Sequence, residues 1–326
     1  MNKVTVVGAG AWGTALAIQA ARAGNAVTLW ARDRATAAAI EQTRESHRLP
    51  NHRLPGTVRV TSELPDQTDL TLLVVPMQHM RSVLPRLPAA PVAICAKGVE
   101  GGTLSLPLEV LTAERPDCPG VVLTGPNFAH EVATGLPAAA VVAGVDPALR
   151  DRIAAMIGTP AFRLYGNDDP IGAQLGGAAK NVIGIAAGAV IGAGLGENAR
   201  AALITRGLAE LGRLTVALGG RAETVMGLSG LGDLLLTCTG PSSRNFSLGV
   251  ALGRGETLAA ILATRSTVTE GVATAPALTA RASRHDPRVE LPICEAVADL
   301  LQGRLTLAEA IARLLARPRR DEHGER

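Results

Sequence analysis

The stretch Val4–Gly13, which reads VTVVGAGAWG, decides the fold of this 326-residue chain. A run of strand-forming residues passes directly into a G-x-G-x-x-G pattern that opens a helical segment. Gly8 permits a tight turn, Gly10 lets the backbone approach a pyrophosphate, and Gly13 allows the helix to pack closely on the strand. The free amides of the first helical turn are placed to bind phosphate oxygens. The stretch therefore predicts a β-turn-α unit that binds a dinucleotide.

The same alternation of strand and helix continues through the first half of the chain. Short apolar runs alternate with helical segments such as Trp12–Ala23 and Arg34–Arg44, a pattern typical of a parallel sheet with crossover helices. We predict strands at Val4–Val7, Ala26–Trp30, Val58–Val60, Leu70–Val75, Val92–Ala96, Val121–Leu123 and Ala138–Ala143. The N-terminal half is therefore expected to be an α/β domain with a Rossmann-type, doubly wound sheet.

The sequence changes character after Asp168. From Pro170 to Ala316 it shows helical periodicity with few strand signals, and its main breaks are Gly227–Gly232 and Thr239–Ser243. We expect a Rossmann domain that binds NAD(P) at residues 1–168 and an all-α C-terminal domain, with the substrate and catalytic groups, at residues 169–318. A charged tail follows at residues 319–326.

The composition excludes several classes of protein. Because 47% of the residues are hydrophobic and 19% are charged, the chain is not expected to be disordered. The formal net charge is +3 and 2% of the residues are aromatic, so we expect no nucleic-acid partner, which would need a basic groove and stacking rings. The longest uncharged apolar stretch, Val182–Gly196, is too short to span a bilayer, so we expect no membrane span.

The cysteines and the first residues indicate a compartment. The four cysteines are scattered and form no Cys-x-x-Cys pair, so we expect neither a disulfide framework nor a metal site. The chain enters an apolar run directly after Lys3, without a signal-peptide pattern. We therefore expect a cytoplasmic protein.

The end of the second predicted strand bears on the choice of cofactor. An NAD site usually places Asp or Glu about 20 residues after the glycines, where it binds the ribose 2′-hydroxyl. Here the strand ends in Leu29-Trp30-Ala31-Arg32-Asp33, and Ala31 offers nothing to a hydroxyl. Arg32 is suited to a 2′-phosphate, although a solvated loop arginine is the alternative. We expect NADP(H), with NAD(H) tolerated.

Lys180 lies in an otherwise apolar helical segment. The positions Gly176, Lys180, Gly184, Gly188 and Gly192 recur every four residues and so share one stripe of the helix. Because each interior glycine costs about 1 kcal/mol relative to alanine, such a stripe indicates the close approach of another element or of a ligand. Burial lowers the pKa of a lysine and makes it a suitable general base. The alternative is a lysine that extends to solvent from the start of the helix.

Other polar residues lie where ligands of doubly wound sheets bind, beyond the carboxyl ends of strands. Lys97 follows one predicted strand and Gly125–Ala129 follows the next, although a lysine at a strand end is more often merely solvated. Further along, Asp233 lies in a glycine-spaced apolar stretch, and Ser242–Asn245 offers donors suited to phosphate. Asp233 and Ser243 are equally suited to capping helices.

Several long motifs, in order along the chain, resemble those of bacterial NAD(P)-dependent glycerol-3-phosphate dehydrogenase. The matching segments run collinearly from residue 4 to about residue 295 and so cover nearly the whole chain. They are Gly8–Ala17, Ala96–Gly98, Gly125–Ala129, Gln174–Val182, Thr205–Glu210, Gly230–Leu234, Ser243–Asn245 and Val268–Gly271.

This resemblance implies the reversible, NAD(P)H-dependent reduction of dihydroxyacetone phosphate to sn-glycerol 3-phosphate, which supplies the backbone of phospholipids. Lys180 corresponds to the catalytic proton acceptor, which serves as proton donor in the reduction. Arg244 would hold the phosphate, and Asp233 would orient the substrate or Lys180. The implied substrate ligands are Lys97, Gly125, Asn127, Lys180, Asp233, Ser243, Arg244 and Asn245.

The resemblance also implies a set of cofactor contacts and shows three departures from the family pattern. With the motif glycines included, the cofactor contacts are Gly8, Gly10, Ala11, Trp12, Gly13, Arg32, Lys97, Ala129, Arg244, Val268 and Glu270. The family commonly has Ser or Thr at the position of Asn127, Lys at that of His130 and an aromatic residue at that of Arg48.

Two other functions fit parts of this pattern. A related NADP-dependent dehydrogenase of β-hydroxy acids would use Arg244 for a carboxylate instead of a phosphate. A non-catalytic dinucleotide sensor would bind cofactor without oxidising it and would have no use for Lys180 on a glycine stripe. A homodimer is possible, with the apolar second domain at the interface.

Overall fold

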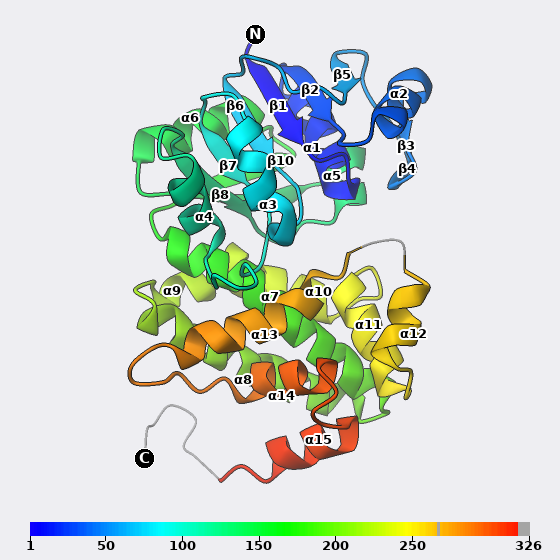
Figure 1. Cartoon of the computed structure of the whole chain (residues 1–326), viewed down its shortest axis with the longest axis vertical. Helices are drawn as coiled ribbons and strands as arrows, with labels where there is room; N and C mark the ends of the chain where they lie inside the picture. The colour runs from blue at the N-terminus through cyan, green and yellow to red at the C-terminus, as the bar shows by residue number, and fades with distance from the viewer. Residues whose placement is uncertain (266–267, 319–326) are drawn as a thin grey trace.

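The N-terminal half of the protein is built on one eight-stranded sheet, drawn in blue to green in the upper part of Figure 1. The computed structural model describes residues 1–265 and 268–318, so the tail expected at 319–326 lies outside the described residues. Along the chain the strands of the sheet are β1 (Lys3–Val7), β2 (Ala26–Trp30), β5 (Val58–Thr61), β6 (Leu70–Leu73), β7 (Val92–Ile94), β8 (Gly120–Thr124), β9 (Ala138–Ala143) and β10 (Phe162–Asn167).

The order of the strands confirms the doubly wound fold. Across the sheet they lie in the order β10-β9-β8-β7-β6-β1-β2-β5. The run from β5 to β8 is parallel throughout and has the spatial order 3-2-1-4-5-6 of a Rossmann sheet. One edge differs from the all-parallel expectation, because β9 is antiparallel to β8 and β10 is parallel to β9.

Apolar side chains on both faces of the sheet explain why its central strands read as continuous apolar runs. Val6 and Leu72 belong to a core on one face, which is covered by α1 (Ala11–Arg22), α2 (Arg34–Thr43), α5 (Ala129–Thr134) and α6 (Pro147–Ile157). Their neighbours Val7 and Leu73 point to the other face, which is covered by α3 (Met77–Val83) and α4 (Pro107–Glu114). Crossover helices on both faces leave the carboxyl ends of the strands open at one edge.

The sequence patterns missed two features of this half. In the strand β10 only Phe162 is buried, and the strand contains Arg163, so it lacks the continuous apolar run of a central strand. The hairpin of β3 (Glu45–Ser46) and β4 (Leu49–Arg53) forms a separate two-stranded sheet of mostly exposed residues. Edge strands and polar hairpins bury too little for the apolar pattern to reveal them.

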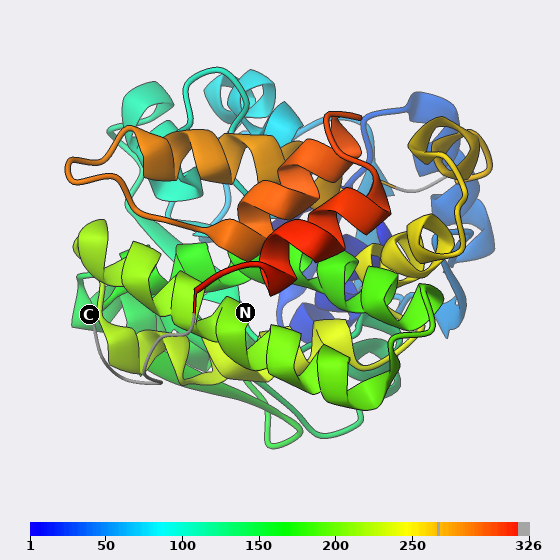
Figure 2. The same ribbon diagram turned by 90° about the horizontal axis from the view of Figure 1, so that it is seen from below.

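The C-terminal half is helical, as expected. Its elements pack around one long central helix, α7, and share one apolar core. In Figure 2, the orange-to-red helices α13 to α15 lie beside the green helices α7 and α8. The elements are α7 (Pro170–Gly192), α8 (Gly196–Ala217), α9 (Ala222–Val225), the π-helical turn η2 (Leu228–Gly232), α10 (Asp233–Cys238), α11 (Arg244–Gly253), α12 (Leu258–Ala263), α13 (Glu270–Ser283), α14 (Pro292–Leu301) and α15 (Leu307–Leu315).

The helix α7 is longer than the uncharged stretch that the sequence analysis considered. It has 23 residues and is long and apolar enough to cross a membrane by length and composition alone. However, 83% of its most apolar window is buried inside the protein. The other helices of the C-terminal half provide that burial, so α7 has the environment of a core helix.

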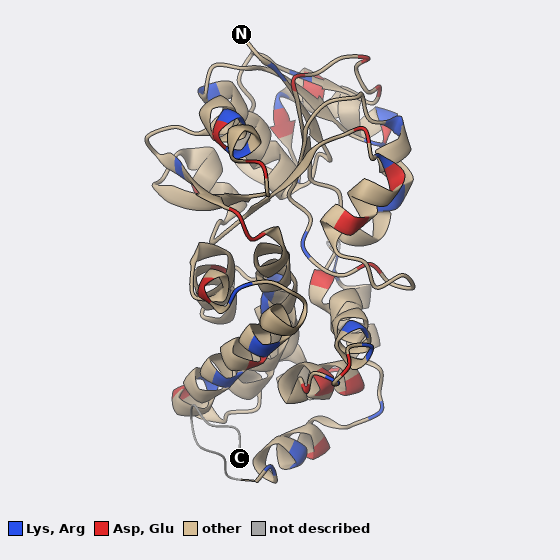
Figure 3. Cartoon of the chain, turned by 90° about the vertical axis from the view of Figure 1, so that its left-hand side faces the viewer, with Lys and Arg blue, Asp and Glu red and all other residues tan. Residues whose placement is uncertain are grey.

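The two halves of the chain meet between Asn167, where β10 ends, and Pro170, where α7 begins. We keep the domain boundary at residues 168 and 169 as a proposal in agreement with this change of structure. Figure 3, which shows the left-hand side of Figure 1, has acidic and basic residues interspersed over both halves.

Candidate active site

The first residues of the site lie just beyond the carboxyl ends of two neighbouring strands of the sheet. Lys97 lies just beyond β7, and Gly125 follows the adjacent strand β8. Gly125 has a φ of 139°, which favours glycine, and its carbonyl oxygen accepts a hydrogen bond of 3.4 Å from Lys97 Nζ. The loops that follow these two strands therefore lie close together.

The glycine stripe of α7 is explained by close approach of other helices. A Cβ atom at Gly176 would lie 2.3 Å from the backbone oxygen of Ser229 in η2, and one at Gly188 would lie 2.0 Å from that of Phe246 in α11. Glycines are required here because the neighbouring backbones leave no room for a side chain. Between these contacts, Lys180 faces the first residue of α10.

Asp233 joins the two lysines of the site. Its Oδ1 atom accepts from Lys180 Nζ at 2.6 Å, and its Oδ2 atom pairs with Lys97 Nζ. The Asp233 side chain is 1% exposed, whereas those of Lys180 and Lys97 are 13% and 17% exposed. The carboxylate is therefore buried behind two ammonium groups that still reach the surface of the site. Lys97 comes from the sheet, and the other two residues come from the helical half.

Asp233 does not cap a helix, which was one alternative from the sequence. The cap position of α10 is Gly232, and Asp233 is the first helical residue after the π-helical turn η2. Irregular helical turns of this kind occur often at functional sites. Here the turn delivers the carboxylate to the lysines and leaves its side chain free of a capping role.

The surroundings of Lys180 tune its acidity. Burial, together with the charge of Lys97, lowers the pKa of its ammonium group to about 8, although Asp233 and Glu270 oppose this shift. Burial in turn raises the pKa of Glu270, against the pull of Arg244, Lys180 and Lys97. The buried thiol of Cys238 also lies within the field of Lys180. Near neutral pH, Lys180 can therefore both give up and take up a proton.

Gly177, which the sequence analysis did not select, makes room for Lys97. A Cβ atom at Gly177 would lie 3.3 Å from Cγ of Lys97 and 3.4 Å from the hydroxyl oxygen of Thr124. That hydroxyl is buried and has no hydrogen-bond partner among the described residues. The alkyl stem of Lys97 thus passes along the face of α7 one turn from Lys180.

The start of α11 places Ser243, Arg244 and Asn245. Ser243 caps the helix, because its hydroxyl accepts from the amide of Phe246 at 3.3 Å, so the capping alternative is confirmed for this residue. Arg244 is exposed and donates to the carbonyl oxygen of Val268 at 2.9 Å. Both residues lie at a helix N-terminus, which favours an anion.

Asn245 is buried and its side chain is already engaged. Its amide nitrogen donates to Oδ1 of Asn181 at 2.8 Å, and its oxygen accepts from the backbone amide of Gly271 at 3.1 Å. These bonds join α7, α11 and α13 next to Lys180. Asn181 was not selected from the sequence, although it adjoins Lys180 as a second polar residue in the same apolar stretch.

The turn between β1 and α1 has the shape that a pyrophosphate requires. Gly8 has a φ of 120°, and a Cβ atom at Gly13 would lie 1.8 Å from the carbonyl oxygen of Gly8. At Gly10, by contrast, nothing lies within 4 Å of the Cβ position, so the space beside it is open. No side chain among residues 1–265 and 268–318 caps α1, which leaves the amides of its first turn available. These residues therefore fit the phosphates of a dinucleotide.

The remaining predicted cofactor contacts lie around this turn or beside the lysines. Arg32 is exposed just beyond β2, and the next residue, Asp33, caps α2 by accepting from the amide of Thr36 at 2.7 Å. Ala129 begins α5, in the loop after β8 that also holds Asn127. Asn127 donates to the carbonyl oxygen of Ala139 at 3.1 Å, while its own side-chain oxygen is buried without a hydrogen-bond partner in the part of the chain that the structure describes.

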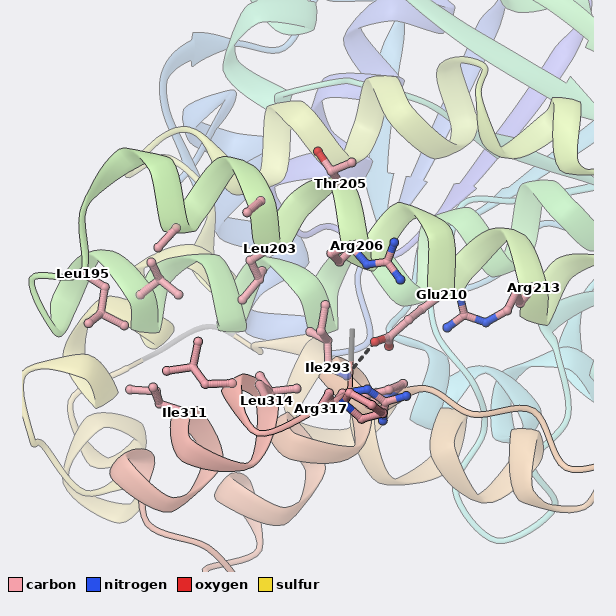
Figure 4. Close-up of a pocket in the computed structure, with 16 residues that line it drawn as sticks. Leu195, Leu203, Thr205, Arg206, Glu210, Arg213, Ile293, Ile311, Leu314 and Arg317 are labelled. Atoms are coloured by element: carbon pink, nitrogen blue, oxygen red, sulfur yellow. Dashed lines mark hydrogen bonds between the residues drawn. The ribbon is translucent and has the colours of Figure 1, made fainter. Parts of the chain in front are cut away.

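A cavity of about 610 Å³ lies elsewhere, among α8, α14 and α15 (Figure 4). It includes Thr205, Arg206 and Glu210 from one of the quoted sequence motifs. Glu210 accepts from the backbone amides of Ile293 at 2.7 Å and Cys294 at 3.3 Å, so it caps α14 from another helix. This motif therefore has a structural role in the C-terminal half.

Comparison with known proteins places this chain in a family. The models of the C-terminus and the N-terminus of NAD-dependent glycerol-3-phosphate dehydrogenase match residues 169–312 and 3–149. The chain is 54% identical over 320 residues to an NAD(P)+-dependent glycerol-3-phosphate dehydrogenase of Gluconobacter oxydans, with 97% of each chain covered. It is 56% identical over 319 residues to the enzyme of that name from Acidiphilium cryptum, again with 97% of each covered. The crystal structure of glycerol-3-phosphate dehydrogenase from Coxiella burnetii is 36% identical, covers 97% of this chain and 99% of its own, and superposes with a TM-score of 0.92.

Proposed function

The chain belongs to the NAD-dependent glycerol-3-phosphate dehydrogenase family, and we propose that Lys180, held by Asp233 beside Lys97, is its catalytic acid and base. The enzyme reduces dihydroxyacetone phosphate to glycerol 3-phosphate with NAD(P)H, and the reaction is reversible. Membership of this family sets aside both a hydroxy-acid dehydrogenase and a non-catalytic sensor. The observation that carries the proposal is the buried Asp233 carboxylate bonded to both lysines.

Lys180 supplies the proton that the reaction needs. When bound, the reduced nicotinamide supplies a hydride from C4 to C2 of the ketone. The carbonyl oxygen then carries the electron pair of the former π bond, and the ammonium group of Lys180 donates a proton to it and becomes a neutral amine. In the oxidation of glycerol 3-phosphate, the neutral amine of Lys180 takes the proton from the hydroxyl. A pKa of about 8 suits both directions.

The other residues of the site hold the substrate and the acid. Asp233 fixes the direction of the Lys180 ammonium through its Oδ1 atom, and Lys97 adds a second positive charge beside the developing negative oxygen. Arg244 and the first turn of α11 are suited to the phosphate of the substrate. Asn245 would act through its place in that turn, since its side chain is bonded to Asn181 and Gly271. The loop of Gly125 and Asn127 would line the opposite side.

The proposed cofactor contacts fall into two groups, one for the phosphates and one for the nicotinamide half. The glycine turn and the first turn of α1, including Ala11 and Trp12, would hold the pyrophosphate, and Arg32 would pair with the 2′-phosphate of NADP(H). Ala129, Val268 and Glu270 would lie along the nicotinamide half, towards Lys180. We propose that the enzyme prefers NADP(H) and tolerates NAD(H).

Three further expectations from the sequence, on the pathway, the location and the oligomeric state, remain predictions. A supply of glycerol phosphate for phospholipid synthesis follows from the product of the reaction. A cytoplasmic location is supported by the four cysteines, all of which are buried and free. A homodimer is supported only by the apolar character of the C-terminal half.

The test of the acid-base role uses the small number of lysines in the chain. Only Lys3, Lys97 and Lys180 are present, and Lys3 is exposed at the start of β1. Following NADPH absorbance with dihydroxyacetone phosphate, we expect Lys180→Met to lower kcat by about 10²–10⁴-fold, the usual contribution of a general acid. NADPH binding should be unchanged, because Lys180 is not among the phosphate contacts.

Lys3→Met is the matched control and should retain wild-type turnover. If Lys180→Met turned over at the wild-type rate, Lys180 would not be the acid, and the proposal would be wrong.

A further inference from the structure

The segment that follows Lys97 lies across a helix of the other half of the molecule. Gly98 has a φ of 136°, and a Cβ atom there would lie 2.8 Å from the hydroxyl oxygen of Thr274 in α13. Farther along the segment, the carbonyl oxygen of Leu104 accepts from Nη1 of Arg281, also in α13, at 2.7 Å. Thr274 and Arg281 are seven residues apart, which places them two turns apart on one face of the helix. The segment 98–106 therefore runs along α13.

Arg281 forms a bidentate salt bridge between the two halves of the molecule. Its Nη1 and Nη2 atoms donate to Oε2 and Oε1 of Glu109 in α4, both at 2.7 Å. The same carboxylate accepts from the backbone amide of Leu106 at 2.7 Å. The flat guanidinium matches a carboxylate in this paired geometry, which fixes its orientation as well as its distance. One arginine thus holds the far end of the segment and the start of α4 together.

The backbone of the segment supports this assignment. Leu104 has a φ of 65°, an unfavourable conformation for a leucine, and its side chain is buried. Such a conformation persists where the surroundings hold the residue from several sides. Here the amide of Leu104 donates to the carbonyl oxygen of Glu100 at 3.0 Å, while its own carbonyl oxygen receives the bond from Arg281.

Other contacts of the segment lie within the N-terminal half. Gln78 bonds to the backbone of Val99 and Gly101, both at 2.9 Å, and Arg81 pairs with Glu100 at 2.7 Å. These bonds fold the segment locally without reference to α13. Arg281 is distinct because it sets the position of the segment relative to the helical half, which carries Asp233 and Lys180.

We propose that Arg281 is a positioning residue for the reaction: its bonds to Glu109 and Leu104 hold segment 98–106 on α13 and so keep Lys97 against Asp233. Arg281 does not touch the substrate. Along α13 it lies 11 residues from Glu270, or about 16 Å at the rise of an α-helix. It acts through Lys97, the residue directly before the segment that Arg281 holds. The proposal rests on the role proposed above for Lys97.

The test compares Arg281→Met, Lys97→Met and the double variant. Arg281→Met should lower kcat/KM for dihydroxyacetone phosphate about tenfold, equivalent to about 1.4 kcal/mol, with the NADPH dissociation constant within about twofold of wild type. In the Lys97→Met background the same substitution should have no further effect, because there is no ammonium left to position. Arg281→Lys, which keeps the charge and loses the fork, should fall between Arg281→Met and wild type.

Arg304→Met is the matched control, because Arg304 pairs with Asp299 on the surface of the helical half, and its kcat/KM should equal that of wild type. If Arg281→Met fails to fold, Glu109→Gln weakens the same bond from the other side and should show a smaller loss of kcat/KM. An unchanged kcat/KM in the folded variant would overturn the proposal, as would a tenfold loss that persists in the Lys97→Met background. If Lys97→Met itself matched wild type, the proposed role of Lys97 would be wrong, and the positioning role would fall with it.

Discussion

At the scale of single residues, the site depends on the difference between lysine and arginine. The chain has 32 basic residues, and only Lys3, Lys97 and Lys180 are lysines. An arginine stays charged at all relevant pH values, whereas a buried lysine can release its proton near neutral pH. Two of the three lysines converge on Asp233. The scarcity of lysine is a sequence signal that would have strengthened the assignment of Lys97.

The sequence predicted the members of the site more readily than their pairing. Lys180 was selected as a candidate from its glycine stripe, and Asp233 from its glycine-spaced setting. However, Lys97 is 136 residues from Asp233 and Lys180 is 53 residues from it, so no local pattern could reveal the bridge. Gly177 was missed for the same reason, because its neighbour is a side chain from the other half.

Arg32 gives a test of cofactor choice at this scale. Its guanidinium lies exposed beyond β2, where a 2′-phosphate would be bound. We expect Arg32→Ala to raise the NADPH dissociation constant about tenfold, the cost of losing a bond to a charged group, and to leave that of NADH nearly unchanged. Titration of both cofactors measures the ratio directly.

The matched control is Arg152→Ala, on an exposed position of α6. If Arg32→Ala left the ratio of NADPH to NADH affinity at its wild-type value, Arg32 would be a solvated loop arginine without a role in cofactor choice.

At the scale of elements, the buried strands and the glycine-rich helix could be predicted, and the irregular elements could not. Strands buried on both faces are continuously apolar, and α7 has a four-residue glycine period that fits its contacts with η2 and α11. The strand β10 was missed because it lies at the sheet edge and buries only Phe162. The turn η2 was expected as a break, and its π-helical residues pack closely against Gly176 of α7.

The helix α14 gives a prediction about stability. Its N-terminus has no cap of its own and is capped by Glu210 of α8, whose pKa is raised by burial to about 7 from an ordinary value of 4.5. Because the folded state holds this proton more tightly than the unfolded state, the contribution to stability is present below about pH 4.5 and is lost as the pH rises through about 7. Glu210→Gln keeps an oxygen acceptor and cannot ionise. Its Tm relative to wild type should therefore be higher at pH 8 than at pH 5.5.

Glu309→Gln is the control, because Glu309 accepts from the amide of Thr306 in the capping box of α15 but is exposed and has a lowered pKa. Its Tm relative to wild type should be similar at the two pH values, since Glu309 is ionised at both. If the difference in Tm between Glu210→Gln and wild type were the same at both pH values, Glu210 would not titrate in this range.

At the scale of the whole molecule, the site exists only where the two halves meet. The sheet supplies Lys97 and the glycine turn, whereas the helical half supplies Lys180, Asp233 and the start of α11. The sequence indicated both halves and their order. The way they are held together, through Arg281 and Glu109 among others, depends on contacts between residues far apart in the chain. Such contacts follow from the completed fold and have no local signature.

The most direct test of this arrangement is the pH dependence of kcat/KM for dihydroxyacetone phosphate reduction, measured with saturating NADPH in wild type and in Lys97→Met. In wild type, kcat/KM should be constant at low pH and fall above a midpoint near 8, because only the ammonium form of Lys180 donates a proton. Lys97→Met should move that midpoint upward, because a neighbouring positive charge that favours proton loss has been removed. A profile without a break between about pH 7 and 9, or a midpoint that stayed or fell in Lys97→Met, would contradict the account.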